Sequence, residues 1–559
     1  MSKNIAEQFV EILVKAGIKR IYAVTGDSLN FLNDAIKREG SIQWIHVRHE
    51  EVGAFAAAAE AELDGLAVCA GSSGPGHVHL INGLYEANRG NVPVLAIAST
   101  CESSEFGTSY FQETNTIKLF DDCSVYNQVA NTPEQAPRML QAALQHAISQ
   151  KGVSVLGVPG DLFEAKSEKN ISSDLVFKTN PRIIPSEEEI NWIANQLNSG
   201  KKVAIYCGIG ASEAHTEVVA LAEKLKAPIG YSFRGKMGIQ YNNPYEVGMT
   251  GLLGLPSAFK AMHEADIVLL LGTDFPYVRF MPTDKVILHI ADKPERLGRR
   301  AQLTRGFAGK IKDSLINLLP LIKINDNQDF LDKQLEFYQK VKNNLRSYVE
   351  DKGKENHISP EFVAETINQK ANKDTIFTVD TGMCCVWGAR YLEATGERKL
   401  LGSFNHGTMA NAMPMAIGAQ LSHPDKQVIA LCGDGGLSML LGDIATIKQY
   451  NLPIKIIVFN NRSLGMVKLE MEVNGIPDNE TDMVNPDFGL LAQAFGINGI
   501  NVTDPEKVET AIQDALAIDG PVLVNIFTDP NALAMPPKVG WEQMKGMGEK
   551  KKKMMLDGN

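Results

Sequence analysis

Two polar residues in the last third of the sequence have the types and the spacing to bind a metal ion together. Asp434 lies in Cys-Gly-Asp-Gly-Gly after the apolar stretch 427–432, and Asn461 lies in Phe-Asn-Asn after the apolar stretch 454–459. If both stretches are parallel strands, the two side chains meet at the carboxyl edge of one sheet, where open α/β sheets bind ligands. A carboxylate, an amide oxygen and phosphate oxygens together suit octahedral Mg2+. Either motif alone is usually a turn, but the pair predicts a site for Mg2+ and a diphosphate.

The glycines around Asp434 are consistent with a phosphate nearby. Gly433, Gly435 and Gly436 carry no side chain, so the backbone there can approach an anion closely. Residues 437–450 are predicted to form one helix, whose amino end favours negative charge.

Glu50 is a second candidate for chemistry. It follows a short strand-like stretch, 44–47, and opens a helical segment whose residues 54–59 are rich in alanine. On the residues alone, a carboxylate in the first turn of a helix is favoured by the helix dipole and needs no catalytic role.

Short β-branched stretches alternate with helical patterns along the whole chain, which predicts parallel sheets covered by helices on both faces. The predicted strands lie at 21–24, 66–69, 94–98 and 153–158, then at 203–206, 229–232, 267–271 and 286–290, and finally at 376–379, 428–431, 454–459 and 522–527. The pattern therefore predicts an α/β protein with three doubly wound parallel-sheet domains.

Proline and capping patterns indicate where the domains begin. The segment 181–185 starts and ends with proline and cannot continue a helix, and Ser186 with Glu189 forms a capping box for the next helix. Ser359 followed by Pro360 is the start of a later helix. The predicted domains are 1–180, 186–325 and 338–530, with a tail at 531–559.

Composition narrows the classes of function. The chain has 559 residues, more than one hydrophobic core supports, and its net charge of −11 repels a phosphate backbone, so nucleic acid is not an expected partner. The 7 cysteines are scattered without a C-x-x-C pair, which indicates buried thiols in a reducing compartment. No stretch approaches the ~18 apolar residues of a membrane span, and the amino terminus lacks the apolar core of a signal peptide. A cytoplasmic location is expected.

Beyond the metal motif, several stretches resemble the thiamine diphosphate-dependent enzymes, above all their pyruvate oxidase and quinone-linked pyruvate dehydrogenase branch. The matching stretches, spread over essentially the whole chain, are Gly26-Asp27-Ser28, Arg48-His49-Glu50-Glu51-Val52, Gly74-Pro75-Gly76, Tyr110-Phe111-Gln112-Glu113, Gly402-Ser403-Phe404-Asn405-His406-Gly407 and 432–461. The resemblance implies a pyrimidine-binding, an FAD-binding and a diphosphate-binding domain, in this order. It also implies thiamine diphosphate, Mg2+ and FAD as cofactors.

The reaction implied by this resemblance is oxidative decarboxylation of pyruvate to acetate and carbon dioxide, with electrons passed through FAD to a quinone. Two related reactions stay open: acetolactate synthase-type carboligation, and phosphate- and oxygen-dependent formation of acetyl phosphate. A nucleotide-binding scaffold without catalysis is a further alternative, which intact Glu50, Asp434 and Asn461 oppose. The family also implies a homotetramer in which the cofactor lies between two subunits, so that Glu50 and Asp434 act in trans.

Particular residues take roles by the same resemblance. Glu50 is the implied catalytic glutamate, which hydrogen-bonds the aminopyrimidine ring of the cofactor. Gly407 would accept a hydrogen bond from the amino group of that ring, and Met409 would be the large apolar residue that bends the cofactor. The residues implied in the pyruvate pocket are Phe111, Gln112 and Glu470, and the implied metal ligands are Asp434, Asn461 and Ser463. Further implied contacts of thiamine diphosphate are Thr408, Gly433, Gly435, Gly436, Leu464, Gly465 and Met466.

The implied flavin contacts lie mainly in two segments of the middle domain. They are Thr250, Gly251, Leu252, Leu253, Thr273, Asp274, Phe275, Pro276 and Tyr277. Asp292 is a further implied contact, but it is shifted by one residue relative to the family pattern, so on a strand its side chain would point to the other face. Gly208 and Gly210 could form a close-approach turn. Met466, implied to act in catalysis, stands where quinone-linked relatives carry an aromatic residue near the flavin.

The end of the chain departs from the quinone-linked branch, whose members end in an amphipathic helix that binds the membrane. Residues 548–559 include four consecutive lysines but are too short to form such a helix reliably. A solvated tail is expected, and peripheral contact with the inner face of the cell membrane is only weakly supported.

Overall fold

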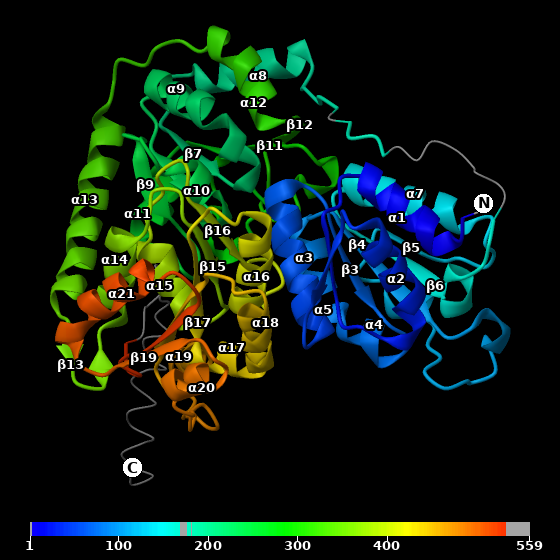
Figure 1. Ribbon diagram of the computed structural model, residues 1–559. Helices are drawn as coiled ribbons and strands as arrows, with labels where there is room; N and C mark the ends of the chain where they lie inside the picture. The colour runs from blue at the N-terminus through cyan, green and yellow to red at the C-terminus, as the bar shows by residue number, and fades with distance from the viewer. Residues whose placement is uncertain (1–2, 168–175, 180, 533–559) are drawn as a thin grey trace.

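The computed structural model describes residues 3–167, 176–179 and 181–532, which form three α/β domains, each around a six-stranded parallel sheet (Figure 1). This confirms the predicted fold class. The first domain lies beside the third, and the middle domain lies above the third in the view of Figure 1.

The first domain has the strand order β2-β1-β3-β4-β6-β5. Its strands are β1 (Arg20–Ala23), β2 (Gln43–His46), β3 (Ala67–Gly71), β4 (Val94–Thr100), β5 (Tyr126–Val129) and β6 (Val153–Pro159). The helices that pack on one face are α1 (Ile5–Lys15), α2 (Asn30–Glu39) and α7 (Ala136–Gln150), and those on the other are α3 (Glu50–Asp64) and α5 (Ile81–Gly90).

The middle domain has the order β12-β11-β10-β7-β8-β9. Its strands are β7 (Val203–Cys207), β8 (Ile229–Tyr231), β9 (Glu246–Met249), β10 (Ile267–Leu271), β11 (Val286–Ala291) and β12 (Arg305–Ala308). The covering helices are α8 (Glu187–Leu197), α9 (His215–Leu225) and α12 (Ile311–Leu318) on one face and α11 (Pro256–Glu264) on the other. The long helix α13 (Asp329–Glu350) then leads to the third domain (Figure 1).

The third domain has the order β16-β15-β17-β18-β20-β19. Its strands are β15 (Ile376–Val379), β16 (Lys399–Gly402), β17 (Val428–Gly433), β18 (Lys455–Asn460), β19 (Asn498–Val502) and β20 (Val522–Phe527). The helices on one face are α14 (Pro360–Lys370), α15 (Met383–Tyr391) and α21 (Val508–Ala517), and those on the other are α16 (Ala412–Ser422), α18 (Ile444–Gln449) and α20 (Phe488–Ala494).

The predicted strands correspond to the four inner strands of each sheet, whereas most of the edge strands were missed. The edge strand β2 overlaps the strand-like stretch 44–47, whereas the edge strands β5, β9, β12, β16 and β19 were not predicted. Inner strands are buried along nearly their whole length, while β5 and β19 are mostly half-buried or exposed. An edge strand therefore lacks the continuous apolar run that marks a parallel strand in sequence.

Two predicted helix starts are confirmed by their caps. The hydroxyl of Ser186 accepts the Glu189 N–H at 3.2 Å, and the Glu189 carboxylate accepts the Ser186 N–H at 2.9 Å, which completes the capping box of α8. The hydroxyl of Ser359 accepts the Phe362 N–H at 3.3 Å at the start of α14.

The single helix predicted at 437–450 is wrong. Helix α17 (Asp434–Met439) already begins at Asp434, and a 3₁₀ turn, Leu441–Asp443, separates it from α18. The interruption allows the Asp443 carboxylate to accept the backbone N–H of Arg48 in the first domain at 2.8 Å. A contact between domains thus accompanies the loss of helical continuity.

The first and third domains share one hydrophobic core. Helices α3 and α16 lie side by side (Figure 1), and residues from both belong to the same buried cluster. A Cβ added to Gly418 on α16 would come within 2.0 Å of the Ala56 carbonyl oxygen on α3, so glycine permits this close approach.

Two further predictions concerned buried thiols and membrane-spanning segments. All 7 cysteines are buried and none is in a disulfide. Within the part of the chain that the structure describes, no helix combines the length and apolar character needed to cross a membrane.

Candidate functional site

Asp434 is the first residue of α17 and follows β17 directly. Its side chain is buried. Oδ1 accepts the backbone N–H of Gly435 at 3.0 Å, while Oδ2 accepts the backbone N–H of Arg462 and the amide of Asn485, both at 2.7 Å. Because a carboxylate oxygen offers about two lone pairs, Oδ2 is filled and Oδ1 retains one for another ligand.

Asn461 and Ser463 lie in a tight turn directly after β18. Arg462 between them has a φ of 54°, and the Asn461 Oδ1 accepts the Ser463 N–H at 3.1 Å. The Ser463 hydroxyl is buried and has no hydrogen-bond partner among the described residues. Since Arg462 also binds Asp434, the three predicted metal ligands lie at the same edge of the sheet. Their oxygen donors fit a hard cation such as Mg2+.

The first turn of α17 is closely surrounded by side chains from other segments. A Cβ on Gly435 would lie 3.0 Å from Leu464 and 3.1 Å from Met409, and a Cβ on Gly436 would lie 2.3 Å from the Asp380 carboxylate. At position 436 a Cβ would overlap the Asp380 carboxylate, whereas at position 435 the ends of the Leu464 and Met409 side chains would have to shift slightly. The packing brings Met409 and Leu464, two predicted cofactor contacts, next to Asp434.

Burial dominates the electrostatics of this edge. Burial raises the pKa of Asp434, although hydrogen bonds from Asn485, Gly435 and Arg462 act to lower it. Burial likewise raises the pKa of Asp380 to about 7, against hydrogen bonds from neighbouring backbone N–H groups. A cation at Asp434 would favour the ionised carboxylates and so offset the cost of burying them.

The predicted cofactor contacts Gly407 and Thr408 lie in a turn held by Ser403. The backbone N–H groups of both residues donate to the Ser403 hydroxyl at 2.9 Å, and that hydroxyl donates to the Glu86 carboxylate on α5. The Thr408 hydroxyl also accepts a hydrogen bond from Asn82 of α5 at 3.0 Å. The third domain thus presents this turn against the first.

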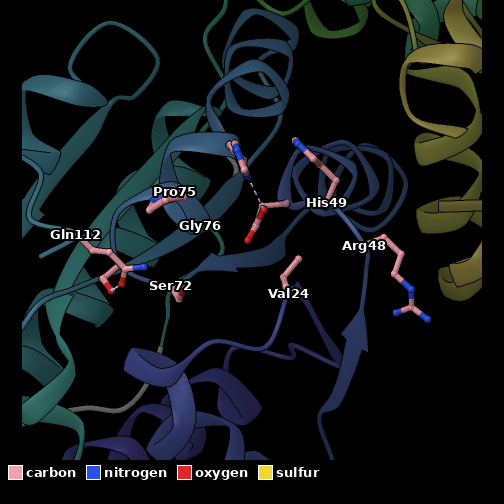
Figure 2. A pocket seen from close by; sticks show the side chains of 10 residues that line it. Val24, Arg48, His49, Ser72, Pro75, Gly76 and Gln112 are labelled. Atoms are coloured by element: carbon pink, nitrogen blue, oxygen red, sulfur yellow. Dashed lines mark hydrogen bonds and ion pairs between the residues drawn. The ribbon is translucent and has the colours of Figure 1, made fainter. Parts of the chain in front are cut away.

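Glu50 begins α3 and forms part of a pocket of about 280 Å³ in the first domain (Figure 2). His49 caps the helix, because its Nδ1 accepts the Glu51 N–H at 3.2 Å. The Glu50 side chain is buried, and the lining of the pocket includes Gly76 and Gln112, with Gln112 on the opposite side from His49 (Figure 2). All the lining residues belong to the first domain.

His79 holds one oxygen of Glu50. Its Nδ1 lies 3.0 Å from the Glu50 Oε2, and its ring stacks on that of His49 with centroids 4.5 Å apart. The ligand atoms of His49, Glu50 and His79 lie within 4.8 Å of one another, a spacing that a metal could use. Because the two imidazole rings are stacked, however, their in-plane lone pairs point side by side and do not converge on one metal ion. The His49 Nδ1 also already accepts the N–H that caps α3. The arrangement therefore suits positioning of the Glu50 carboxylate.

Among the residues predicted for the pyruvate pocket, Gln112 lies with Glu50. Gln112 has a φ of 62°, and its Oε1 accepts the Ser73 hydroxyl at 2.8 Å. Phe111 is 75% exposed, Glu470 is exposed on α19 (Gly465–Val473), and Met466 packs against the core of the third domain. In the described part of the chain, these last three residues do not line the Glu50 pocket.

The two predicted flavin segments lie against each other. Gly251 has a φ of 104°, and a Cβ there would lie 2.8 Å from Phe275 and 3.6 Å from Tyr277. The buried Thr250 hydroxyl and the His289 Nε2 have no hydrogen-bond partner within the described residues. These unpartnered polar atoms fit a ligand with many hydrogen-bonding groups, as FAD is.

Two residues of the second predicted flavin segment, Asp274 and Tyr277, interact electrostatically with groups outside the segment. Burial would raise the pKa of Asp274, but hydrogen bonds and charge from Arg299 and Arg300 outweigh it, and the pKa is lowered. Burial raises the pKa of Tyr277, and the charges of Cys385 and Glu470 in the third domain act in the same direction. The segment 273–277 therefore lies at the boundary between the middle and third domains.

Asp292 follows strand β11, and Gly208 and Gly210 follow strand β7. Strand β11 ends at Ala291, so Asp292 lies past the strand and the expectation for a side chain on a strand does not apply to it. Its Oδ1 lies 4.0 Å from the Arg296 Nη1, and its contact with the flavin stays a prediction. A Cβ on Gly208 would come within 2.3 Å of the Gly272 carbonyl oxygen, so the close approach is to protein backbone. The predictions for the lysines of the tail lie outside the described residues.

Several contacts at these sites join residues far apart in the sequence. Asn485 binds Asp434, Asp443 binds the backbone of Arg48, and Asn82 bridges Thr408 and Glu51. Each residue is an ordinary polar side chain in a loop or helix, and no local pattern marks it. The Asn-Pro-Asp-Phe stretch that starts at Asn485 offers only the signal of a capped helix, since Asp487 caps α20.

Comparison with known proteins matches the three domains one by one. Residues 3–119 match the thiamine pyrophosphate enzyme N-terminal TPP binding domain, residues 190–318 the central domain and residues 380–526 the C-terminal TPP binding domain. The chain is 35% identical to YdaP of Bacillus subtilis, whose name describes it as thiamine pyrophosphate-containing, over 98% of this chain and 95% of that protein. It is 31% identical to a pyruvate oxidase of Lactiplantibacillus plantarum, over 92% of this chain and 87% of that protein. An acetolactate synthase isozyme 2 large subunit of Escherichia coli is 28% identical, over 94% and 96%.

Proposed function

Because the chain belongs to the thiamine pyrophosphate enzyme family, we propose that it oxidatively decarboxylates pyruvate to acetate and carbon dioxide and passes the electrons through FAD to a quinone. The similarity to a pyruvate oxidase supports the substrate class. The observation that carries the proposal is the pocket that Glu50 shares with Gln112.

The residues at the third-domain edge would hold the cofactor. Asp434, Asn461 and Ser463 would bind Mg2+ through their oxygens, and the backbone at Gly433, where an added Cβ would meet only the Cys384 Sγ at 3.8 Å, could approach a diphosphate. Thiamine diphosphate, when bound, supplies an electron sink for the decarboxylation of a 2-oxo acid.

The first-domain pocket would handle protons and substrate. His79 fixes the Glu50 Oε2, which leaves Oε1 to exchange a proton with a ligand ring beside Gly76. Ser73 binds the Gln112 Oε1, which leaves the Gln112 Nε2 to donate to the carboxylate of pyruvate.

The middle domain would hold FAD between the segments 250–253 and 273–277. Within the described residues, the Thr250 hydroxyl and the His289 Nε2 have no hydrogen-bond partner, and the second segment borders the third domain. An anaerobic spectrum tests this step directly. The purified protein should be yellow, and its flavin should bleach when pyruvate is added with Mg2+ and thiamine diphosphate. Persistent flavin colour with every 2-oxo acid tried would overturn the proposal.

Carboligation is the second candidate, favoured by the similarity to acetolactate synthases. Product analysis separates the reactions, because oxidation gives acetate whereas carboligation of two pyruvates gives a C5 hydroxy-keto acid. Phosphate-dependent formation of peroxide would instead indicate the oxygen-linked reaction. Steady-state rates with ubiquinone, menaquinone and oxygen as alternative acceptors identify the electron acceptor.

We also propose a homotetramer in which two subunits complete each active site. The Glu50 pocket is lined by first-domain residues alone, so a third domain must still supply the metal ligands. Mixing a Glu50→Ala chain with an Asp434→Ala chain should restore part of the activity. No recovery despite subunit exchange would mean that each chain uses its own third domain, which its own Arg48–Asp443 contact already brings to the start of α3.

A further inference from the structure

A continuous line of hydrogen-bonded side chains crosses the third sheet from β17 to β19. Its members, here called the asparagine chain, are in order Asp434, Asn485, Asn460, Asn525, Asn501 and Asp487. The five hydrogen bonds between neighbours measure 2.7, 2.9, 3.0, 2.8 and 2.7 Å. The asparagine chain therefore connects the predicted metal ligand Asp434, at the start of α17, with Asp487, the cap of α20.

Burial makes the amides of this chain depend on one another. Asn460 is 1% exposed and Asn525 is fully buried, so each must find its partners inside the protein. An ionised carboxylate at either end can only accept hydrogen bonds. The Asn485 NH2 group therefore faces Asp434 and Asn460, and the Asn460 and Asn525 amides each donate towards Asp487.

The segment that carries Asn485 is paired with the metal-binding turn. The Leu464 N–H donates to the Thr481 carbonyl at 2.8 Å, the Met483 N–H donates to the Arg462 carbonyl at 2.9 Å, and Ser463 forms an antiparallel bridge with Asp482. The same backbone unit thus presents Ser463 from one side and Asn485 from the other.

We propose that Asn485 is a positioning residue for the Mg2+ site, an inference that rests on the proposed binding of thiamine diphosphate and Mg2+ at Asp434. With the Arg462 N–H, the Asn485 amide occupies Oδ2 of Asp434, so the carboxylate is fixed with Oδ1 available to the metal. Residues that orient metal ligands in this way typically contribute about 10- to 100-fold in metal affinity.

The test is calorimetric titration of the full-length protein with Mg2+ in the presence of saturating thiamine diphosphate and without substrate. Asn485→Leu keeps the approximate size of the side chain and removes the amide, and it should weaken Mg2+ binding by about 10- to 100-fold. Asn501→Leu is the matched control, because it breaks the same asparagine chain at its far end. It should leave Mg2+ binding within about twofold of wild type, by the same reasoning on direct ligand orientation.

Thermal unfolding of the cofactor-free proteins separates positioning from general damage. Both leucine variants should melt at a lower temperature than wild type by a similar amount, since each leaves residues of the asparagine chain without hydrogen-bond partners. Only Asn485→Leu should also bind Mg2+ more weakly. If Asn485→Leu does not fold, Asn485→Ala takes its place, because it removes the amide that donates to Asp434 without adding bulk or charge.

Unchanged Mg2+ affinity in the folded position-485 variant, or an equal loss in Asn501→Leu, would overturn the inference while leaving the proposed function standing. Absence of any Mg2+-dependent binding in the wild-type protein would instead overturn the proposed cofactor site.

Discussion

Gly418 on α16 faces the backbone of Ala56 on α3 so closely that a Cβ at position 418 would come within 2.0 Å of the Ala56 carbonyl oxygen. Gly418→Ala should therefore force the two helices apart. Overpacking of this kind costs about 1 to 3 kcal/mol or more, and a backbone neighbour cannot rotate away. Chemical denaturation should show the loss.

Gly442→Ala is the matched control, because a Cβ there meets no atom of the described residues within 4 Å. It should leave the free energy of unfolding nearly unchanged. Equal stability of both variants would mean that α3 and α16 separate without cost.

Glu50→Gln should lower the rate of pyruvate turnover by about 10²- to 10⁴-fold, since general acid–base groups contribute on that scale. Thiamine diphosphate binding, followed by calorimetry, should change far less than the rate. Glu51→Gln alters the neighbouring carboxylate, which binds Asn82 at 2.7 Å and does not line the pocket, and should retain most of the activity. A larger rate loss in Glu51→Gln than in Glu50→Gln would reassign the catalytic glutamate.

Thiamine diphosphate with Mg2+ should raise the melting temperature of the wild-type protein, because a ligand at about 100 times its Kd adds about 2.7 kcal/mol. Removal of Mg2+ with EDTA should reverse the rise. Asp434→Ala should show no rise at all. Asp443→Asn, which weakens a contact to Arg48 instead, should melt at a lower temperature but keep the ligand-induced rise.

Stability should depend on pH through Glu86. Burial raises the pKa of Glu86 from 4.5 to about 7. The folded protein then keeps a proton that the unfolded chain releases, so this carboxyl destabilises the fold progressively as pH rises from about 4.5 to about 7, by about 1.4 kcal/mol per pKa unit. Glu86→Gln removes the effect. The melting temperature of the variant relative to wild type should rise between pH 5 and pH 7.5, and a constant difference would contradict the assignment.

Gly251→Ala should reduce the flavin content of the purified protein. The φ of 104° is strained for alanine, at about 1 to 3 kcal/mol, and the new Cβ would lie 2.8 Å from Phe275. Gly107→Ala provides the control, since Gly107 has a φ of 81° but, in the part of the chain that the structure describes, no atom lies within 4 Å of an added Cβ. Absorbance per chain near the flavin maximum measures the outcome. Equal flavin content in both variants would place FAD away from the segment 250–253.

The inner strands could be predicted from sequence because both of their faces are covered by helices, which demands continuous apolar stretches such as Val153–Pro159. Tyr126–Val129 and Asn498–Val502 could not, since an edge strand has a neighbour on one side only and tolerates polar residues. The interruption before Asp443 escaped prediction for a different reason. It accompanies a hydrogen bond between Asp443 and Arg48 of another domain, which no local pattern reports.

Site residues divide in the same way. Asp434 and Asn461 each directly follow a strand, so their order in the sequence was sufficient to predict that they lie at one edge of the sheet; their role as metal ligands stays a prediction. The placement of Gln112 beside Glu50 came from family resemblance. Asn485 contacts Asp434, 51 residues away in the sequence, and His79 contacts Glu50, 29 residues away. Only the folded chain brings these residues together.

Two hydrogen bonds, from Arg48 to Asp443 and from Ser403 to Glu86, limit which domains of this protein can be exchanged with those of a relative. In each pair one partner belongs to the first domain and the other to the third. A chimera that takes its first domain from a relative would bring a foreign surface against Asp443 and Ser403. Chimeras that exchange the first and third domains together, and keep the middle domain, should therefore be better folded than those that exchange either alone.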